Sequence, residues 1–305
     1  MERGKNIALG VLLALFAAAL ALHPGESAEA ARQGLRLCFE TVLPSLFPFF
    51  VLSSLFLSTG AAARFGHALE GVMRPLFRLS GAGAGALVLG LAGGYPVGAR
   101  TAAELYRRGS LTREEAERLL SFCNNAGPGF VMGICGGAVF GSVRAGALLC
   151  LIHAVSALLT GFLLSRPGRA PQASAARGGS FPAAPEPRAG LFPAAVRDSF
   201  AAAWSVCGFV VIFAVLLRFL SLILPPHPLL LGFAELTNGV LALSPDRGGF
   251  MTCAALLGWG GLSVHAQTLS VLEDTDLSPR RYFLGKAVQA LLSLPLARLA
   301  SMWLF

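Results

Sequence analysis

Long apolar runs are the feature that most constrains how this chain can fold. The runs at 145–164, 200–224 and 282–305 are each about 20 residues or longer, the length at which an α-helix crosses the hydrocarbon core of a bilayer. Hydrophobic residues make up 55% of the chain and charged residues only 13%, whereas soluble domains carry roughly a quarter charged residues. The sequence therefore predicts an all-α, polytopic integral membrane protein whose first partner is the lipid bilayer.

The charges of the chain are mostly positive. The formal net charge of +8 comes from 24 basic and 16 acidic residues, and every basic residue except Lys5 and Lys286 is an arginine. A basic excess in a membrane protein is typical of cytoplasmic loops, so nucleic acid is not an expected partner. The same excess is compatible with an anionic substrate. The most charged segment, 101–120, is predicted to be a polar helix in water or at the membrane interface.

Motifs for catalysis and for metal binding are missing from the sequence. The six cysteines never approach C-x-x-C spacing, and the five histidines form no H-E-x-x-H motif. The chain has neither a G-x-S-x-G nucleophile elbow nor a Walker motif. We therefore expect no enzyme activity, no metal site and no cofactor.

A Pro-, Ala-, Gly- and Ser-rich segment at 166–188 divides the chain in two. With four arginines and one acid, it is predicted to be a flexible cytoplasmic linker between membrane halves at 1–165 and 189–305. At the start of the first half, the apolar run 7–22 is predicted to be an uncleaved first span. A cleaved signal peptide is the alternative for that run.

Glycine- and proline-interrupted segments recur inside the apolar regions of both halves. The first half contains GGYPVGAR at 93–100 and FCNNAGPG at 122–129, and the second contains GWGGLSVHAQ at 258–267. When 91–101 is aligned with 258–268 without a gap, the paired glycines coincide. This similarity predicts an internal repeat, in which the chain consists of two related halves with broken or re-entrant helices. Chance similarity is the alternative. Interrupted segments at matching places in two halves are typical of a transporter binding site.

The first candidate binding residues surround the Asn-Asn pair. Asn124 and Asn125 offer amide donors and acceptors beside a backbone break at Gly127 and Pro128, inside an apolar region where polar groups are costly. Such a break can bind a carboxylate or another polar ligand, helped by the positive end of the following helix. The alternative is that the asparagines cap a helix or hydrogen-bond to a neighbour.

A second break, at Gly94, Tyr95 and Pro96, is followed by Arg100. An arginine at that distance can bind an anion as a forked donor. The alternative is that Arg100 extends to the cytoplasmic surface and helps to set the topology.

The second half supplies the remaining candidates. Ser263, His265 and Gln267 alternate along one segment, and Glu235 and Asn238 lie on one helical face, so together they are predicted to form a polar lining. His265 has the alternative of being a hydrogen-bonded core histidine. A further arginine, at position 218, lies well inside an apolar run and is expected to pair with an acid such as Glu235.

Three separated motifs resemble one known family. The residues at 94–99 and 122–128, with 43–49 upstream, resemble the sporulation integral membrane protein YlbJ family, which belongs to the wider nucleoside-recognition or Gate group of membrane domains. The segment 259–267 is similar to a later motif of that family. The resemblance extends over roughly 37–303 and leaves the linker unmatched.

The resemblance implies a protein of endospore-forming bacteria, located in the outer forespore membrane, that moves dipicolinic acid toward the developing spore. Dipicolinate is a planar dicarboxylate, and broken helices, asparagines and arginines suit such an anion. Nucleosides or other small polar solutes are alternative substrates. A non-transporting assembly or signalling component of the spore envelope is the alternative function, and a homo-oligomer or other sporulation membrane proteins are the candidate protein partners.

Overall fold

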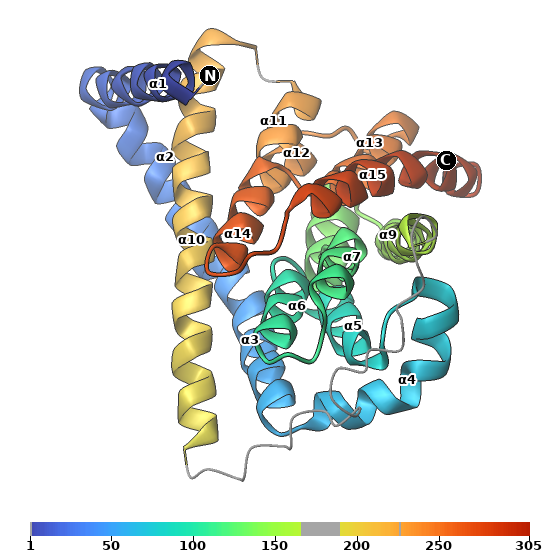
Figure 1. Cartoon of the computed structure of the whole chain (residues 1–305). Helices are drawn as coiled ribbons and strands as arrows, with labels where there is room; N and C mark the ends of the chain where they lie inside the picture. Colours follow the sequence, from blue (N-terminus) through green and yellow to red (C-terminus); the bar gives the residue numbers. More distant parts are fainter. Residues whose placement is uncertain (1, 166–189, 226) are drawn as a thin grey trace.

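The computed structural model describes residues 2–165, 190–225 and 227–305 (Figure 1). The predicted linker at 166–188 lies outside these ranges. Within them every regular element is a helix, which confirms the all-α expectation.

Three of the helices are long and apolar enough to cross a membrane. They are α9 (Val143–Leu164), α10 (Leu191–Ile223) and α15 (Arg280–Ser301). Two further pairs of helices are long and apolar enough to cross a membrane only when the two helices of a pair are counted as one span. Each of these pairs is bent sharply where its two helices join. The first pair is α1 (Glu2–Leu22) and α2 (Pro24–Leu37), which continues to Val42, and the two are bent by 100°. The described part of the chain therefore holds three candidate spans, or up to five if each bent pair counts as one.

The second bent pair joins α4 (Ala61–Phe77) to α5 (Ala84–Gly93) at 99° through the short turn η2 (Gly81–Gly83). The other helices are shorter or more polar, and they pack between the candidate spans. They are η1 (Cys38–Val42), α3 (Leu43–Ser58), α6 (Val97–Arg107), α7 (Arg113–Cys123), α8 (Pro128–Phe130), η3 (Val131–Val139), α11 (Pro228–Ala234), α12 (Leu236–Leu241), α13 (Arg247–Trp259) and α14 (Leu262–Leu272).

The polar segment 101–120 is two helices in place of the single one that we predicted. Gly109 has φ +70 between α6 and α7, and Thr112 starts α7 with a capping box to Glu115. Both helices bury most of their residues, among them Arg118, whose Nη1 donates to the carbonyl oxygen of Arg78 at 2.5 Å. The segment therefore buries one face in the interior, while charged residues such as Arg108 and Arg113 remain exposed on the other.

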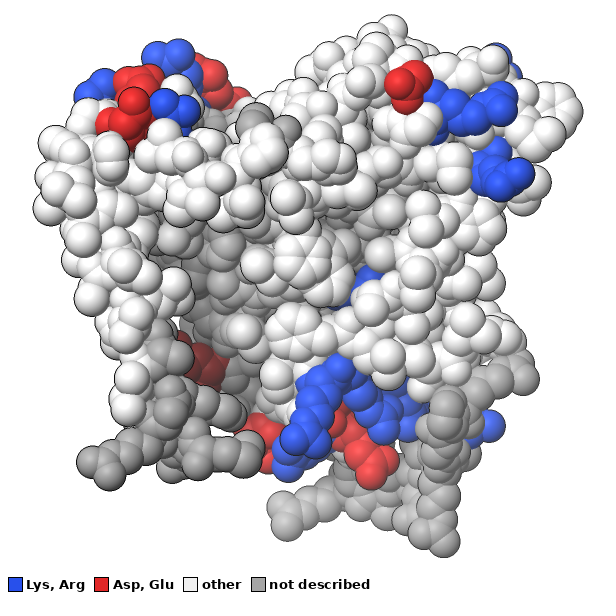
Figure 2. All heavy atoms as spheres, turned by 90° about the horizontal axis from the view of Figure 1, so that it is seen from above, with Lys and Arg blue, Asp and Glu red and all other residues white. Residues whose placement is uncertain are grey.

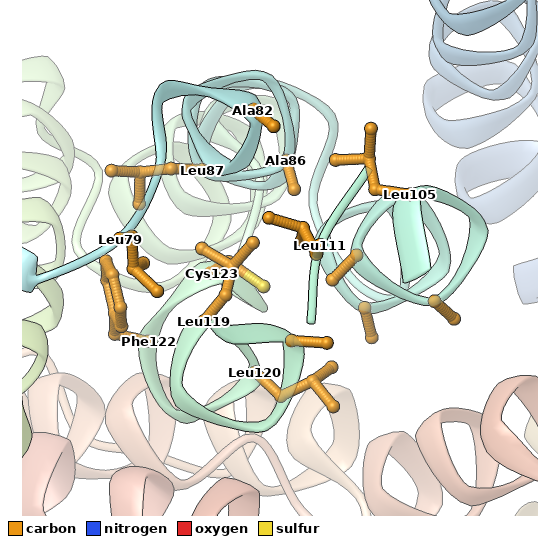
Figure 3. Close-up of a cluster of buried hydrophobic side chains, with 14 of the residues drawn as sticks. Leu79, Ala82, Ala86, Leu87, Leu105, Leu111, Leu119, Leu120, Phe122 and Cys123 are labelled. Atoms are coloured by element: carbon orange, nitrogen blue, oxygen red, sulfur yellow. The ribbon is translucent and has the colours of Figure 1, made fainter. Parts of the chain in front are cut away.

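The main apolar core lies between α5, α6 and α7 (Figure 3). Leu87, Leu119 and Phe122 belong to this cluster, and so does Tyr282 of α15. A second cluster combines first-half residues such as Tyr95 with residues of α13 and α15. The two predicted halves therefore pack into shared cores. The predicted repeat between the halves stays a prediction, although both glycine pairs do end a helix, α5 in one case and α13 in the other.

The face drawn in Figure 2 has the charge distribution of a membrane protein. Figure 2 shows charged side chains gathered at opposite edges of the view, with a broad and almost uncharged band between them. Large apolar side chains are exposed on the candidate spans, for example Leu151 on α9, Trp204 on α10 and Leu291 on α15. Lipid tails are the environment in which such exposure costs little.

Close backbone packing of α6 against α7 gives a stability prediction. A Cβ atom added to Gly98 would lie 1.9 Å from the carbonyl oxygen of Cys123, whereas one added to Gly71 on α4 would meet nothing within 4 Å. Gly98→Ala should therefore destabilise the protein by at least about 2 kcal/mol, because the two backbones must separate. Gly71→Ala is the matched control. Thermal unfolding of the purified variants measures the difference, and equal melting temperatures for both would contradict this packing.

Candidate functional site

Four helix breaks meet in the interior of the protein. Gly94, with φ +84, lies between α5 and α6, and a Cβ atom there would be 2.9 Å from the backbone nitrogen of Gly127, in the break after α7. Gly261, with φ +87, lies between α13 and α14, and a Cβ atom there would be 3.0 Å from the backbone nitrogen of Leu236, at the start of α12. The two pairs of breaks meet because a Cβ atom at Gly260 would lie 3.4 Å from the Tyr95 hydroxyl, so the interrupted motifs of both halves are brought together.

Buried side chains satisfy the backbone groups that these breaks leave free. The Tyr95 hydroxyl donates to the carbonyl oxygen of Leu257 at 2.6 Å, near the end of α13. The amide of Ala126 donates to Nε2 of His153, on α9, at 2.9 Å. Since a buried unpaired backbone group is costly in a membrane, these bonds are what allows the breaks to exist there.

Asn124 links the first-half break to the second half. It is fully buried, and its Nδ2 donates to Oγ1 of Thr268 at 3.0 Å. That oxygen lies 3.2 Å from the Tyr282 hydroxyl, which in turn is 2.8 Å from Nδ1 of His265. The predicted residues Asn124 and His265 thus belong to one hydrogen-bonded chain, joined by two residues that the sequence did not single out.

Asn125 is also fully buried but turns to different partners. Its Nδ2 donates to the carbonyl oxygen of Phe122 at 2.8 Å, and its Oδ1 accepts from Nε2 of Gln289 at 3.0 Å. The two asparagines therefore bond to separate neighbours within the protein. Pro128, two residues after the buried Ala126, is exposed at the start of α8.

Lys286, on α15, is the charged residue at the centre of this buried cluster. No part of it is exposed. Its Nζ donates to the hydroxyl of Tyr95 at 3.3 Å, the carbonyl oxygen of Asn124 at 3.1 Å and Oε1 of Gln289 at 2.8 Å. The ammonium also lies 5.0 Å from the centroid of the Tyr95 ring. We did not select Lys286 from the sequence, although a lysine inside an apolar span is itself a functional signal.

A cavity of about 340 Å³ lies beside the buried cluster, between α6, α10 and α14. Three of the predicted residues line it, namely Pro96, Arg100 and Gln267. The remaining lining residues include hydroxyl groups from α10 and α14 and a charged rim, and they are Arg107, Ala202, Ser205, Val206, Ser270, Val271, Glu273 and Asp274. The cavity is thus open at its rim, with mainly apolar walls that carry four charged residues, Arg100, Arg107, Glu273 and Asp274.

Arg100 is the lining cation with a free donor. Its Nη1 is buried and has no hydrogen-bond partner within residues 2–165, 190–225 and 227–305. Its Nη2 donates to the carbonyl oxygen of Asp198 at 3.4 Å, and its guanidinium carbon lies 5.4 Å from the centroid of the Phe50 ring. The guanidinium therefore contacts the Asp198 carbonyl and the Phe50 ring, and its Nη1 edge has no hydrogen-bond acceptor in the described residues.

Arg107, the second lining cation, is already paired. It forms an ion pair with Asp274 and another with Glu104 at 3.5 Å. The hydrogen bond from Arg107 holds the pKa of Asp274, in the loop after α14, below its usual range. Arg107 and Asp274 therefore compensate each other, and Arg100 and Glu273 are the remaining charged residues of the lining.

Glu235 and Asn238 do not join the central cluster. Glu235 caps α12, since its two carboxylate oxygens accept from the backbone amides of Thr237 at 3.1 Å and Asn238 at 2.8 Å, and from the Asn238 side chain at 2.7 Å. The expected pairing of Arg218 with Glu235 is wrong, because Arg218 forms an ion pair with Glu26 of α2. Asn238 lines a second cavity of about 390 Å³, beside α2 and α10.

The remaining second-half residues are buried on α14. Gln267 donates to Oγ of Ser263 at 3.4 Å. His265 packs edge-on against Trp259, with ring centroids 4.4 Å apart, and its Nε2 has no partner in the described part of the chain. In that part, no group of three or more His, Cys, Asp and Glu side chains could hold a metal ion.

Comparison with known proteins gives a consistent result. The nucleoside-recognition family called Gate matches residues 39–165. The chain is 31% identical over 308 residues to the sporulation integral membrane protein YlbJ of Bacillus subtilis (strain 168), an alignment that covers 88% of this chain and 76% of that protein. No solved structure matches the chain.

Thr268 offers a test of the link between the two halves. Thr268→Val keeps the shape of the side chain but removes the acceptor of Asn124, so a buried amide loses its partner. We expect a loss of about 1–3 kcal/mol in stability. The matched control is Thr252→Val on α13, at a half-buried threonine outside this chain of bonds. Thermal unfolding of both variants is the measurement, and an unchanged midpoint for Thr268→Val would refute the link.

Proposed function

Since the chain belongs to the family of the sporulation integral membrane protein YlbJ and carries a Gate nucleoside-recognition domain, we propose that it is a membrane transporter or channel for a small organic anion, with dipicolinate as the substrate during endospore formation. The lipid bilayer is its environment. By the same relationship we place it in the outer forespore membrane, where other copies or other sporulation membrane proteins are its candidate partners.

The observation that carries the proposal is the cavity with Arg100. Its volume of about 340 Å³ falls within the range of small-molecule sites, roughly 300–1,000 Å³. A guanidinium with a free N–H edge is the group that carboxylates bind most specifically, through parallel hydrogen bonds. In surroundings of low dielectric constant that attraction is stronger than it would be in water.

A planar dicarboxylate suits the distribution of donors around the cavity. Arg100 binds one carboxylate, and the amide of Gln267 with the hydroxyls of Ser205 and Ser270 offers neutral donors for the rest of the molecule. Pro96, in the break after α5, forms part of the wall. The cavity therefore borders a helix break, as broken-helix transporters place their substrates.

The description of the Gate family supports a nucleoside as the second candidate substrate. Neutral donors such as Gln267 and Ser270 would serve a nucleoside, but an uncharged ligand would give the free N–H edge of Arg100 no anionic acceptor. A non-transporting envelope component requires no such cavity. The choice among the three is therefore made by what the cavity binds.

Arg100→Gln in purified protein reconstituted into vesicles tests the proposal. The glutamine keeps polarity but removes the charge and the fork, so initial uptake of labelled dipicolinate should fall at least about tenfold. Arg144→Gln, at an exposed position on α9, is the matched control and should transport like the unchanged protein.

Unlabelled nucleosides and other carboxylates are added as competitors in the same assay. Carboxylates should compete and nucleosides should not. Undiminished uptake by the Arg100→Gln protein would exclude the cavity as the anion site. Competition by nucleosides alone would show that the substrate is a nucleoside and not dipicolinate.

A further inference from the structure

Lys286 is a fully buried charged residue of a candidate membrane span, and it has no acidic partner. Its three hydrogen-bond acceptors are all neutral oxygens, from Tyr95, Asn124 and Gln289. Within the described ranges no carboxylate lies at ion-pair distance from it. A buried charge without a counter-ion costs several kcal/mol, roughly, so such a residue in a membrane span is retained for a function.

The acceptors around Lys286 match the donors of an ammonium group. An ammonium group has three N–H donors, and three acceptors lie within 3.3 Å of Nζ. The Tyr95 hydroxyl donates its own hydrogen to Leu257, which leaves its lone pairs for the lysine. A neutral amine has only two N–H donors, so it could keep only two of the three bonds. The arrangement thus offers one acceptor for each N–H of a protonated lysine.

Two of these three bonds hold helix breaks. Tyr95 precedes Pro96, which lines the cavity, and the Asn124 carbonyl belongs to the break after α7. The Asn124 side chain reaches Thr268, the neighbour of the lining residue Gln267. Loss of the proton from Lys286 would remove one of its three donors, and two of the three acceptors belong to segments that form or support the cavity wall.

The other titratable groups around Lys286 carry no negative charge that would fix its proton. Tyr95 faces it from the break after α5, Cys123 from α7, His153 from α9 and His265 from α14. Tyr282 lies one turn earlier on the same helix. α13 meets this part of α15 through Gly258, at which a Cβ atom would lie 2.6 Å from the Ala290 Cα. The proton is therefore held by neutral neighbours alone.

We propose that Lys286 is the proton-carrying residue of a symport cycle, in which one proton moves across the membrane with each anion. The ammonium favours an anion in the neighbouring cavity because opposite charges attract strongly at low dielectric constant. In the cycle the amine takes one proton from water on the side of solute entry. After the anion leaves, the ammonium gives one proton to water on the other side. The neutral amine then allows the segments at the helix breaks to return to their starting arrangement.

This inference rests on the proposed transport function and is tested in the same vesicles. With the membrane potential clamped, an outside more acidic by one pH unit should drive up to about tenfold accumulation of dipicolinate in vesicles of unchanged protein. The reverse gradient should oppose uptake. Vesicles that move no solute at all would reject the proposed function itself, whereas uptake that only equilibrates, or that follows the opposite gradient, would overturn the symport role alone.

The Lys286→Gln variant tests whether Lys286 is the residue that carries the proton. The variant keeps a hydrogen-bonding side chain but cannot carry the proton, so exchange of labelled for unlabelled dipicolinate should continue while gradient-driven accumulation is lost. Lys5→Gln, at the other lysine of the chain, is the matched control and should accumulate normally. Accumulation by Lys286→Gln equal to that of the control would overturn the assignment.

A readout on the unchanged protein covers the case in which Lys286→Gln does not fold. A pH-sensitive dye trapped inside the vesicles should report acidification when dipicolinate is added outside without any imposed gradient. Solute entry with no change in internal pH would overturn the inference independently of the variant.

Discussion

A broken helix inside a bilayer leaves backbone amides and carbonyls that no water can satisfy, and the structure depends on how these groups are paired. Here the partners are side chains from distant elements. His153 accepts from the break after α7, Tyr95 donates to the end of α13, and Lys286 donates to the Asn124 carbonyl. Each such bond replaces one that an unbroken helix would have made within itself. The polar residues of the interior are therefore structural first, and any transport role is added to that requirement.

The same bonds determine where a solute can be bound. Because the breaks are closed by protein side chains, the central cluster is filled, and open volume lies beside it along α6, α10 and α14. Arg100, Gln267 and Pro96 reach that volume from segments adjoining the breaks. A movement of the breaks would therefore change the wall of the cavity.

Sequence reasoning predicted the elements better than their partners. Composition and apolar runs indicated a helical membrane protein, and the glycine pairs marked true helix breaks, because these signals are local. The predicted partner of Arg218 was wrong, since the acid that pairs with it, Glu26, belongs to α2, far away along the chain. Lys286 was missed although its position inside an apolar run is visible in the sequence; only the identity of its three acceptors required the fold. The two helices at 101–120 were merged because the capping box at Thr112 was not recognised as a helix start.

Ligand-dependent thermal stability of the purified, unchanged protein tests most directly whether the interior holds a site for an organic anion. Dipicolinate, nucleosides and simple carboxylates are each titrated while the unfolding midpoint is followed. A ligand that binds the folded state stabilises it by about 2.7 kcal/mol at a concentration 100 times its dissociation constant. We expect the midpoint to rise with dipicolinate concentration and to stay unchanged with nucleosides. A midpoint that does not respond to dipicolinate, or that responds to nucleosides alone, would contradict an anion site at Arg100.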